Sequence, residues 1–132
     1  MSRNVKRALV LAGGVVLSLA VVAPGPAQAA SKTAYTSPSG YGYATFNTST
    51  RKLTVQDTNG DSRRVVAFVY NESLGGLFIL GAQDANGSNG TPGTATAPSG
   101  SYHSGDTLSI EVCRRNGSAG ADTDCGWATV IA

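Results

Sequence analysis

Two segments near the end of the chain, residues 108–113 and 125–131, alternate apolar and polar side chains, and each carries one cysteine. Alternation with a period of two is typical of β-strands that bury one face. If the cysteines lie opposite each other in an antiparallel hairpin, the register is fixed. The apolar face then holds the pairs Leu108–Val130, Ile110–Ala128 and Val112–Gly126. Glu111 lies opposite Trp127 on the other face, so we expect Trp127 beside the disulfide.

The first 29 residues have the pattern of a secretory signal peptide. Three basic residues precede an apolar run over residues 8–22, and Ala27-Gln28-Ala29 is a small-x-small cleavage signal. The apolar run is too short to be a good membrane span. We therefore expect residues 1–29 to be removed, and the mature protein to be secreted, extracellular and not bound to a membrane.

Removal of this segment changes the charge balance. The full chain has 10 basic and 8 acidic residues, but without Arg3, Lys6 and Arg7 the net charge falls from +2 to −1. A balanced charge gives no support for nucleic-acid binding. The 103 residues that remain of the 132 are enough for one domain with a modest core.

The exported context favours a disulfide between Cys113 and Cys125. Closing a loop of this length stabilises a fold by about 2–3 kcal/mol, mostly by restricting the unfolded chain. A metal site would need more ligands than two cysteines and the lone His103 provide. A redox pair would more often have the Cys-x-x-Cys spacing. We therefore expect no metal and no cofactor.

The composition after the signal peptide predicts an all-β fold. Thr, Ser, Gly, Asn and Val dominate, and no segment has sustained helical periodicity. We expect about five to seven short strands in a small antiparallel β-sandwich, immunoglobulin-like or related. Residues 30–42 are predicted to be an extended flexible leader, and residues 43–132 the β-sandwich domain. Within that domain, the Gly/Ser/Thr-rich residues 81–106 are predicted to be a mobile loop.

A further hairpin is predicted over residues 51–70. Its turn is centred on Asn59-Gly60, because both residues tolerate a positive φ. This register pairs Leu53 with Val66 and Val55 with Arg64. The face predicted to enter the core then consists of Leu53, Val55, Val66 and Phe68.

Candidate catalytic groups are few. His103 is the only histidine, in the segment Ser101-Tyr102-His103-Ser104-Gly105-Asp106, and no Gly-x-Ser-x-Gly elbow is present. Of the eight acids, only Glu111 lies in a confidently predicted strand, and a glycosidase pair would need a cleft. We therefore expect a protein that is not an enzyme, with a small hydrolase as a remote alternative.

Two acidic segments share features with calcium-binding loops. Residues 57–61 have part of the oxygen-rich pattern, but the sequence lacks the later bidentate glutamate and the flanking helices of an EF-hand. A hairpin turn accounts for the same acidic and polar residues. Weak calcium binding at residues 122–124 is left open.

The candidate partner-binding residues are aromatic or basic: Tyr35, Tyr41, Tyr43, Trp127, Lys52 and Arg63. The three tyrosines would anchor the leader if it pairs with a partner's sheet edge or lies in a partner's cleft. An outward Trp127 could instead join them in a flat platform for sugar rings or a peptide. The alternative for Trp127 is that it covers the disulfide inside the core. Lys52 and Arg63 can share the outward face of the predicted hairpin and contact an acidic partner.

Three segments carry a resemblance to known proteins: Leu53-Thr-Val-Gln-Asp57-Thr-Asn-Gly-Asp61-Ser, Gly105-Asp-Thr-Leu-Ser-Ile-Glu-Val-Cys113 and Cys125-Gly-Trp127-Ala-Thr. With them, most of residues 43–132 resembles the small exported proteins of filamentous actinobacteria. Some small secreted β domains of these bacteria are adaptor subunits of extracellular antibacterial particles such as the umbrella toxins. The resemblance implies export and a β fold, and it assigns no functional residue.

These observations together predict a secreted, non-enzymatic module that binds another secreted protein, as an adaptor subunit or an inhibitor. The alternative function is a carbohydrate- or cell-wall-binding module that uses an exposed platform of Trp and Tyr rings.

Overall fold

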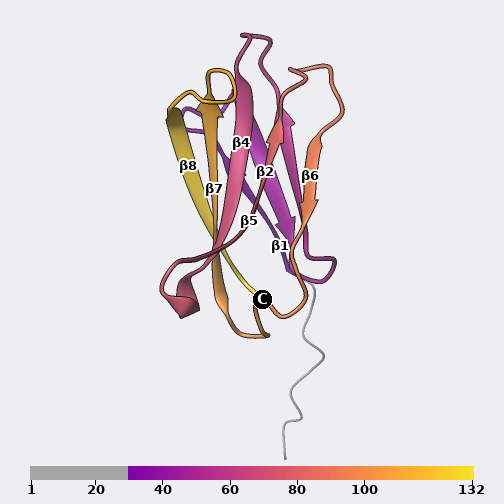
Figure 1. Cartoon of the computed structure of the whole chain (residues 1–132), viewed down its shortest axis with the longest axis vertical. Coiled ribbons are helices and arrows are strands. Elements are labelled where there is room, and N and C mark those ends of the chain that lie inside the picture. Colours follow the sequence, from indigo (N-terminus) through magenta and orange to yellow (C-terminus); the bar gives the residue numbers. More distant parts are fainter. Residues whose placement is uncertain (1–29) are drawn as a thin grey trace, which may run out of the picture.

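The computed structural model describes residues 30–132, so the predicted signal peptide, residues 1–29, lies outside the described part of the chain. Two antiparallel four-stranded sheets face each other (Figure 1). The first sheet has the strand order β1-β2-β3-β6 and the second sheet the order β5-β4-β7-β8. The predicted all-β sandwich is therefore confirmed.

The strands are short in the first sheet and longer in the second. The first sheet consists of β1 (Ser31–Tyr35), β2 (Gly42–Asn47), β3 (Lys52–Asp57) and β6 (Gly93–Thr96). The second sheet consists of β4 (Arg64–Asn71), β5 (Leu77–Asp84), β7 (Thr107–Arg115) and β8 (Asp122–Ile131). A 3₁₀ turn, η1 (Glu72–Leu74), lies between β4 and β5. In the described residues, no helix is long and apolar enough to cross a membrane.

The core lies between the sheets and follows from the alternation of side chains along the strands. β2 and β3 contribute Phe46, Leu53 and Val55, and β7 contributes Leu108, Ile110 and Val112, all fully buried. The predicted final hairpin is confirmed, because β7 and β8 pair Leu108 with Val130, Ile110 with Ala128, Val112 with Gly126 and Glu111 with Trp127.

The predicted hairpin over residues 51–70 is wrong. β3 pairs with β2 and β6, whereas β4 pairs with β5 and β7, so the segment between β3 and β4 crosses from one sheet to the other. The positive φ in this segment is at Ser62 rather than at Asn59 or Gly60. As a result Leu53 and Val55 enter the core, but the outward side of β4 carries Val66 and Phe68.

The predicted flexible leader is wrong for its first half. Residues Ser31–Tyr35 form β1, which pairs with β2 from Ser31–Asn47 to Tyr35–Tyr43. Ala34 is only 1% exposed and belongs to the core. Its small side chain gives little hydrophobic signal, so the alternation was not visible in the sequence. Residues 81–106 also contain ordered pairing, since β6 pairs with β3; the mobility of this segment stays a prediction.

The two sheets approach each other closely along both sides of the sandwich. On one side the Ser37 N–H donates to the Asp124 carbonyl at 2.9 Å, and a Cβ at Gly126 would clash with the Tyr35 carbonyl oxygen. On the other side a Cβ at Gly93 would clash with the Gln83 carbonyl oxygen. The backbones of β1 and β8 are thus in close contact on one side, and those of β5 and β6 on the other; we call these two contacts the seams. They leave little room for an added strand.

Candidate functional site

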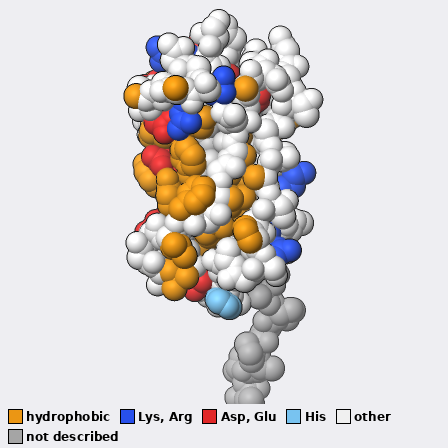
Figure 2. Space-filling model, in the orientation of Figure 1, with side chains coloured by type: hydrophobic (Ala, Val, Ile, Leu, Met, Phe, Trp, Pro, Cys, Tyr) orange, Lys and Arg blue, Asp and Glu red, His pale blue; other side chains and the backbone are white. Residues whose placement is uncertain are grey.

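Aromatic side chains gather on the outer face of the second sheet. Alternation along the strands points Phe68 and Tyr70 of β4, Phe78 of β5 and Trp127 of β8 away from the core, together with Glu111 of β7. We call these five residues the aromatic face. Figure 2 shows hydrophobic side chains concentrated on this side of the molecule.

The rings of the aromatic face form one continuous cluster. The Tyr70 ring centroid lies 6.2 Å from that of Trp127 and 6.0 Å from that of Phe78, and Phe68 lies 6.5 Å from both Tyr70 and Phe78. The planes are inclined to one another, by 31° for Tyr70 and Trp127 and by 57° for Phe68 and Phe78. The cluster is therefore a ridged surface rather than a flat platform.

Much of this surface is exposed. Trp127 is 58% exposed and Phe78 55%, so the alternative that Trp127 lies inside the core is wrong. Further exposed apolar side chains are Leu74, Leu77 and Ile131. Single exposed apolar residues are common, whereas these aromatic side chains are neighbours on one sheet face.

Glu111 lies in the middle of the aromatic face. The register places Glu111 directly between Phe68 on β4 and Trp127 on β8, and Phe68 is in turn opposite Gly81 on β5. One row across the sheet therefore has an aromatic ring on each side of a carboxylate.

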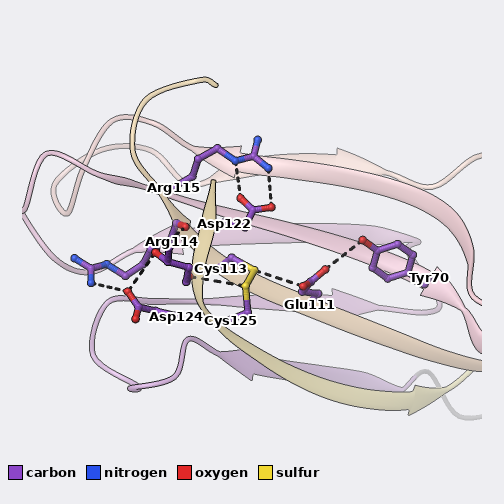
Figure 3. The surroundings of a disulfide bond; sticks show 9 residues. Tyr70, Glu111, Cys113, Arg114, Arg115, Asp122, Asp124 and Cys125 are labelled. Carbon is purple, nitrogen blue, oxygen red and sulfur yellow. Dashed lines mark hydrogen bonds and ion pairs between the residues drawn. A yellow bond between two sulfur atoms is a disulfide. The ribbon is translucent and has the colours of Figure 1, made fainter. Parts of the chain in front are cut away.

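The surroundings of Glu111 raise the pKa of its carboxyl group. Partial burial is the main cause, and the negative charge of Asp122 adds to it, while a hydrogen bond from Tyr70 acts in the opposite direction. The Tyr70 hydroxyl donates to Glu111 Oε2 at 3.2 Å (Figure 3). Burial and the nearby Glu111 carboxylate also raise the pKa of Tyr70. Among the ion pairs of residues 30–132, none involves Glu111.

The predicted disulfide between Cys113 and Cys125 is present next to this carboxylate. Glu111 Oε1 lies 3.6 Å from Cys113 Sγ (Figure 3). The group Glu111, Cys113 and Cys125 has the residue types of a metal site. Both sulfurs are already bonded to each other, however, so they are not thiolate ligands in this state. The disulfide is consistent with an oxidising environment.

A shallow depression borders the aromatic face. It has a volume of about 320 Å³, and its lining residues are Val66, Phe68, Phe78, Gly81, Ala82, Gln83 and Arg115. Gly81 leaves room for the ring of Phe68, because a Cβ at Gly81 would lie 2.9 Å from Phe68 Cδ1. The depression could accept a small apolar group.

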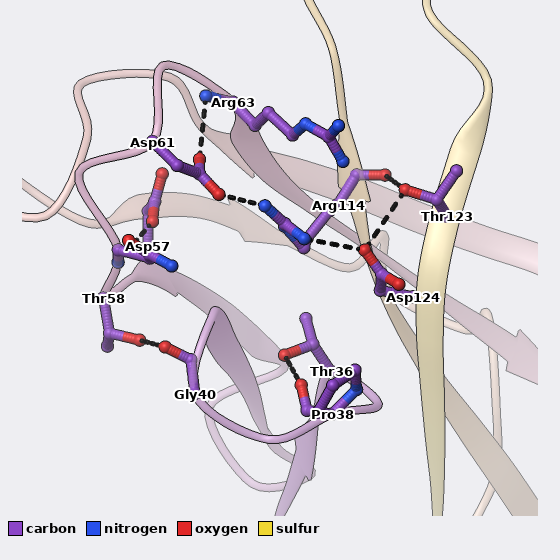
Figure 4. A network of polar contacts seen from close by, with 11 residues as sticks. Thr36, Pro38, Gly40, Asp57, Thr58, Asp61, Arg63, Arg114, Thr123 and Asp124 are labelled. Atoms are coloured by element: carbon purple, nitrogen blue, oxygen red, sulfur yellow. Dashed lines mark hydrogen bonds and ion pairs between the residues drawn. The ribbon is translucent and has the colours of Figure 1, made fainter.

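Arginines and aspartates form a polar cluster at one end of the sandwich (Figure 4). Arg114 binds Asp61 and, at 2.8 Å, Asp124, and its guanidinium carbon lies 3.4 Å from the centroid of the Tyr41 ring. Burial acts to raise the pKa of Asp61, but the hydrogen bond from the Arg63 backbone N–H and the contact with Arg114 together hold this pKa below its usual value. The ion pairs of Arg114 connect the crossing between the sheets with β7 and β8, and Tyr41 packs against the same guanidinium group.

Arg115 extends the cluster toward the aromatic face. It makes two hydrogen bonds to Asp122, at 2.6 and 2.9 Å (Figure 3). Since Asp122 and Asp124 each bind an arginine, a calcium ion at residues 122–124 would have to displace these pairs.

Asp57, by contrast, is buried, and its Oδ2 has no hydrogen-bond partner.

The remaining predicted binding residues do not join Trp127. Tyr35 and Tyr43 pack with ring centroids 5.9 Å apart on the outer face of the first sheet, where β3 also begins with exposed Lys52. Arg63 lies in the crossing segment before β4. The proposed platform of Trp127 with the leader tyrosines is therefore not formed.

Sequence reasoning missed four members of the aromatic face: Phe68, Tyr70, Phe78 and Glu111. The available signal was the position of Glu111 opposite Trp127, which the register of the final hairpin already implied. The positions of β4 and β5 beside this hairpin could not be read from the sequence.

The residues around His103 form a hydrogen-bonded turn. The backbone N–H of His103 donates to Asp106 Oδ2 at 2.9 Å, and the Asn71 amide donates to the same oxygen at 2.9 Å. The Ser101 hydroxyl donates to the Pro98 carbonyl. The aspartate thus stabilises a turn, and no hydrogen bond between a serine hydroxyl and the imidazole occurs in the described residues.

No family model, no curated protein and no solved structure matches this chain.

Proposed function

We propose that this protein is a secreted, non-enzymatic module that binds another secreted protein through the aromatic face. The observation that carries the proposal is the contiguous cluster of Phe68, Tyr70, Phe78 and Trp127 on the outer face of the second sheet. Two of these rings are more than half exposed. Aromatic side chains of this kind supply large contact areas at low cost in conformational entropy, and they are enriched in protein–protein interfaces.

Secretion is supported by the predicted signal peptide and by the disulfide Cys113–Cys125. An adaptor subunit of an extracellular complex is the favoured form of this proposal, and the aromatic face would be its contact surface. An inhibitor would use the same surface, and the two roles differ in the partner rather than in the site.

The mode of binding proposed here is a contact by a sheet face. Pairing of the leader with a partner's sheet edge is not proposed, because Ser31–Tyr35 already pairs with β2. The backbone contacts at the two seams, which involve Gly126 and Gly93, also oppose addition of a partner strand there.

A glycan-binding module is the second candidate. Tyr70 and Trp127 favour it, because their planes are inclined by only 31°. Phe78 weighs against it, since its ring is inclined by 67° to Tyr70 and would project from a flat sugar-binding surface. A partner with a shaped apolar surface fits the ridged cluster better.

Affinity co-purification from the culture supernatant of the source organism tests the proposal. The full chain would be tagged and secreted as wild type, as Trp127→Ala and as Tyr35→Ala. Tyr35 is the matched control, because it is 56% exposed but lies on the first sheet. We expect a stoichiometric secreted protein with the wild type and the control, and its loss with Trp127→Ala.

Equal recovery of the partner with all three variants would show that the aromatic face is not the binding site. Retention on cell-wall polysaccharide that depends on Trp127, without a protein partner, would replace the proposal by the glycan-binding function.

A further inference from the structure

We infer that the aromatic face recognises a cationic side chain, a lysine or arginine of the protein partner, held against Glu111 between the rings of Trp127, Tyr70 and Phe68. This inference rests on the proposed function and specifies the chemistry of the partner. It follows from the position of one acidic group within an otherwise apolar contact surface.

The first argument is the placement of Glu111. It lies on β7 between Phe68 and Trp127 in one row of the second sheet, and it is partly buried by these neighbours. A carboxylate within an apolar interface would lose its remaining water when a partner covers it. That loss is unfavourable unless the partner brings a compensating charge or hydrogen-bond donor.

The second argument is that the nearby cations are already engaged. Arg115 is bound to Asp122 through two hydrogen bonds, and Arg114 is bound to Asp61 and Asp124. Within residues 30–132, no lysine or arginine forms an ion pair with Glu111. Its one side-chain donor is the neutral Tyr70 hydroxyl. The positive charge that would balance Glu111 in a dry interface is therefore expected from the partner.

The third argument is the chemistry of the surrounding rings. A lysine or arginine near the face of Trp or Tyr is attracted by the ring quadrupole, and the attraction increases when water is excluded. The protein already contains contacts of this kind: the guanidinium carbon of Arg115 lies 5.7 Å from the centroid of Phe68, and Arg114 lies over Tyr41. A partner cation at Glu111 would combine ring contact with charge pairing.

The depression beside Phe68 predicts a second feature of the partner. Phe78 and Gly81 also line it. We therefore expect the partner's basic residue to have an apolar residue close by, which would enter this depression. An acidic partner surface would meet the unpaired charge of Glu111 and is disfavoured.

Selection of displayed peptides tests this inference directly. Random dodecapeptides on phage would be selected on the immobilised wild-type protein, and peptides whose affinity falls at least tenfold on Trp127→Ala would be kept. The fluorescence of Trp127, the one tryptophan of the chain, gives a second measure of binding in solution. We expect the retained peptides to share a lysine or arginine next to an apolar residue.

The matched variants are Glu111→Gln and Glu72→Gln, which change the two glutamates of the chain. Glu72 lies on η1 and accepts a hydrogen bond from Ser109, so it borders the same surface without lying between the rings. We expect Glu111→Gln to weaken the retained peptides at least tenfold and Glu72→Gln to weaken them less than twofold. Binding to the wild type should also weaken as salt is raised.

Retained peptides without a basic residue, or with equal affinity for Glu111→Gln and the wild type, would overturn the inference and leave the proposed function intact. A selection that yields no peptide dependent on Trp127 would also overturn it. The proposed function is tested separately by the co-purification, so the two failures can be distinguished. Thermal melting of Glu111→Gln shows whether a loss of binding reflects a loss of fold.

Discussion

The hydroxyl of Tyr70 on β4 donates a hydrogen bond to Glu111 on β7, at 3.2 Å, in the centre of an exposed aromatic surface. This bond stabilises the ionised carboxylate and acts against the effect of burial on its pKa. It therefore helps to keep a negative charge where the surrounding rings disfavour one.

Replacement of Tyr70 by Phe should raise the pKa of Glu111 further, because the hydrogen bond that lowers it is lost. A titration of the Glu111 carboxyl by NMR measures this change. The free energy of unfolding should fall by only about 1 kcal/mol, the usual net contribution of such a bond. Tyr102→Phe is the control, since the Tyr102 hydroxyl donates to the Thr48 carbonyl instead. An unchanged Glu111 pKa in Tyr70→Phe would show that the bond does not form in solution.

Two aromatic truncations should differ strongly in their effect on stability. Phe46 is fully buried between the sheets, so Phe46→Ala should lower the free energy of unfolding by about 3–5 kcal/mol. Trp127 is 58% exposed, and Trp127→Ala should lower it by less than about 1.5 kcal/mol. Denaturant unfolding followed by circular dichroism compares the two. Similar losses would mean that Trp127 is packed in solution.

The role of β1 in the core predicts a sharp contrast between neighbouring residues. Ala34→Asp would bury an unpaired charge and should destabilise the fold by more than about 3 kcal/mol. Tyr35→Asp places the same group on the solvent side of the strand and should cost much less. Thermal melting of both variants measures this difference in stability. Equal and small losses of stability would indicate that residues 30–42 form a free leader in solution.

Asp57 should make stability depend on pH. Burial, with a contribution from the nearby Asp61 and Asp84 charges, raises the pKa of Asp57, although the Asn59 backbone N–H and Arg114 lower it. A raised folded-state pKa means that ionisation of Asp57 costs stability at neutral pH. This cost declines as pH falls from the folded-state pKa to the ordinary value near 3.8.

The comparison with Asp57→Asn isolates this effect. The asparagine Oδ1 can still accept the hydrogen bond from the Asn59 N–H. We expect the wild type to gain stability relative to Asp57→Asn as pH is lowered from 7 toward 4. Urea unfolding at several pH values measures the difference. A difference that does not vary with pH would contradict the assigned shift.

The final hairpin could be predicted in detail because two signals agree there. The alternation of Leu108, Ile110 and Val112 defines the buried face, and the cysteines fix the register between β7 and β8. Together they placed Trp127 opposite Glu111, but the exposure of its ring could only be read from the structure. A local signal is sufficient when both partners of a strand pair are neighbours in sequence.

For the other strand pairs, the sequence did not provide two signals that agree on the buried face and the register. β4 has Val65, Ala67 and Val69 on one side and Val66, Phe68 and Tyr70 on the other, so apolar character does not distinguish its two faces. The segment around Asn59-Gly60 then suggested a hairpin, although the chain crosses between sheets. The aromatic face draws its members from four strands, and its assembly depends on pairings between distant segments.

The close backbone contact at Gly126 has a consequence for how this molecule can associate. Because β1 and β8 already meet there, chains cannot readily join at this seam to form a continuous sheet. Gly126→Ala would push the Tyr35 carbonyl away and separate the two strands. We therefore expect contacts between molecules to form on the broad side of the sandwich rather than by addition of a strand beside Gly126.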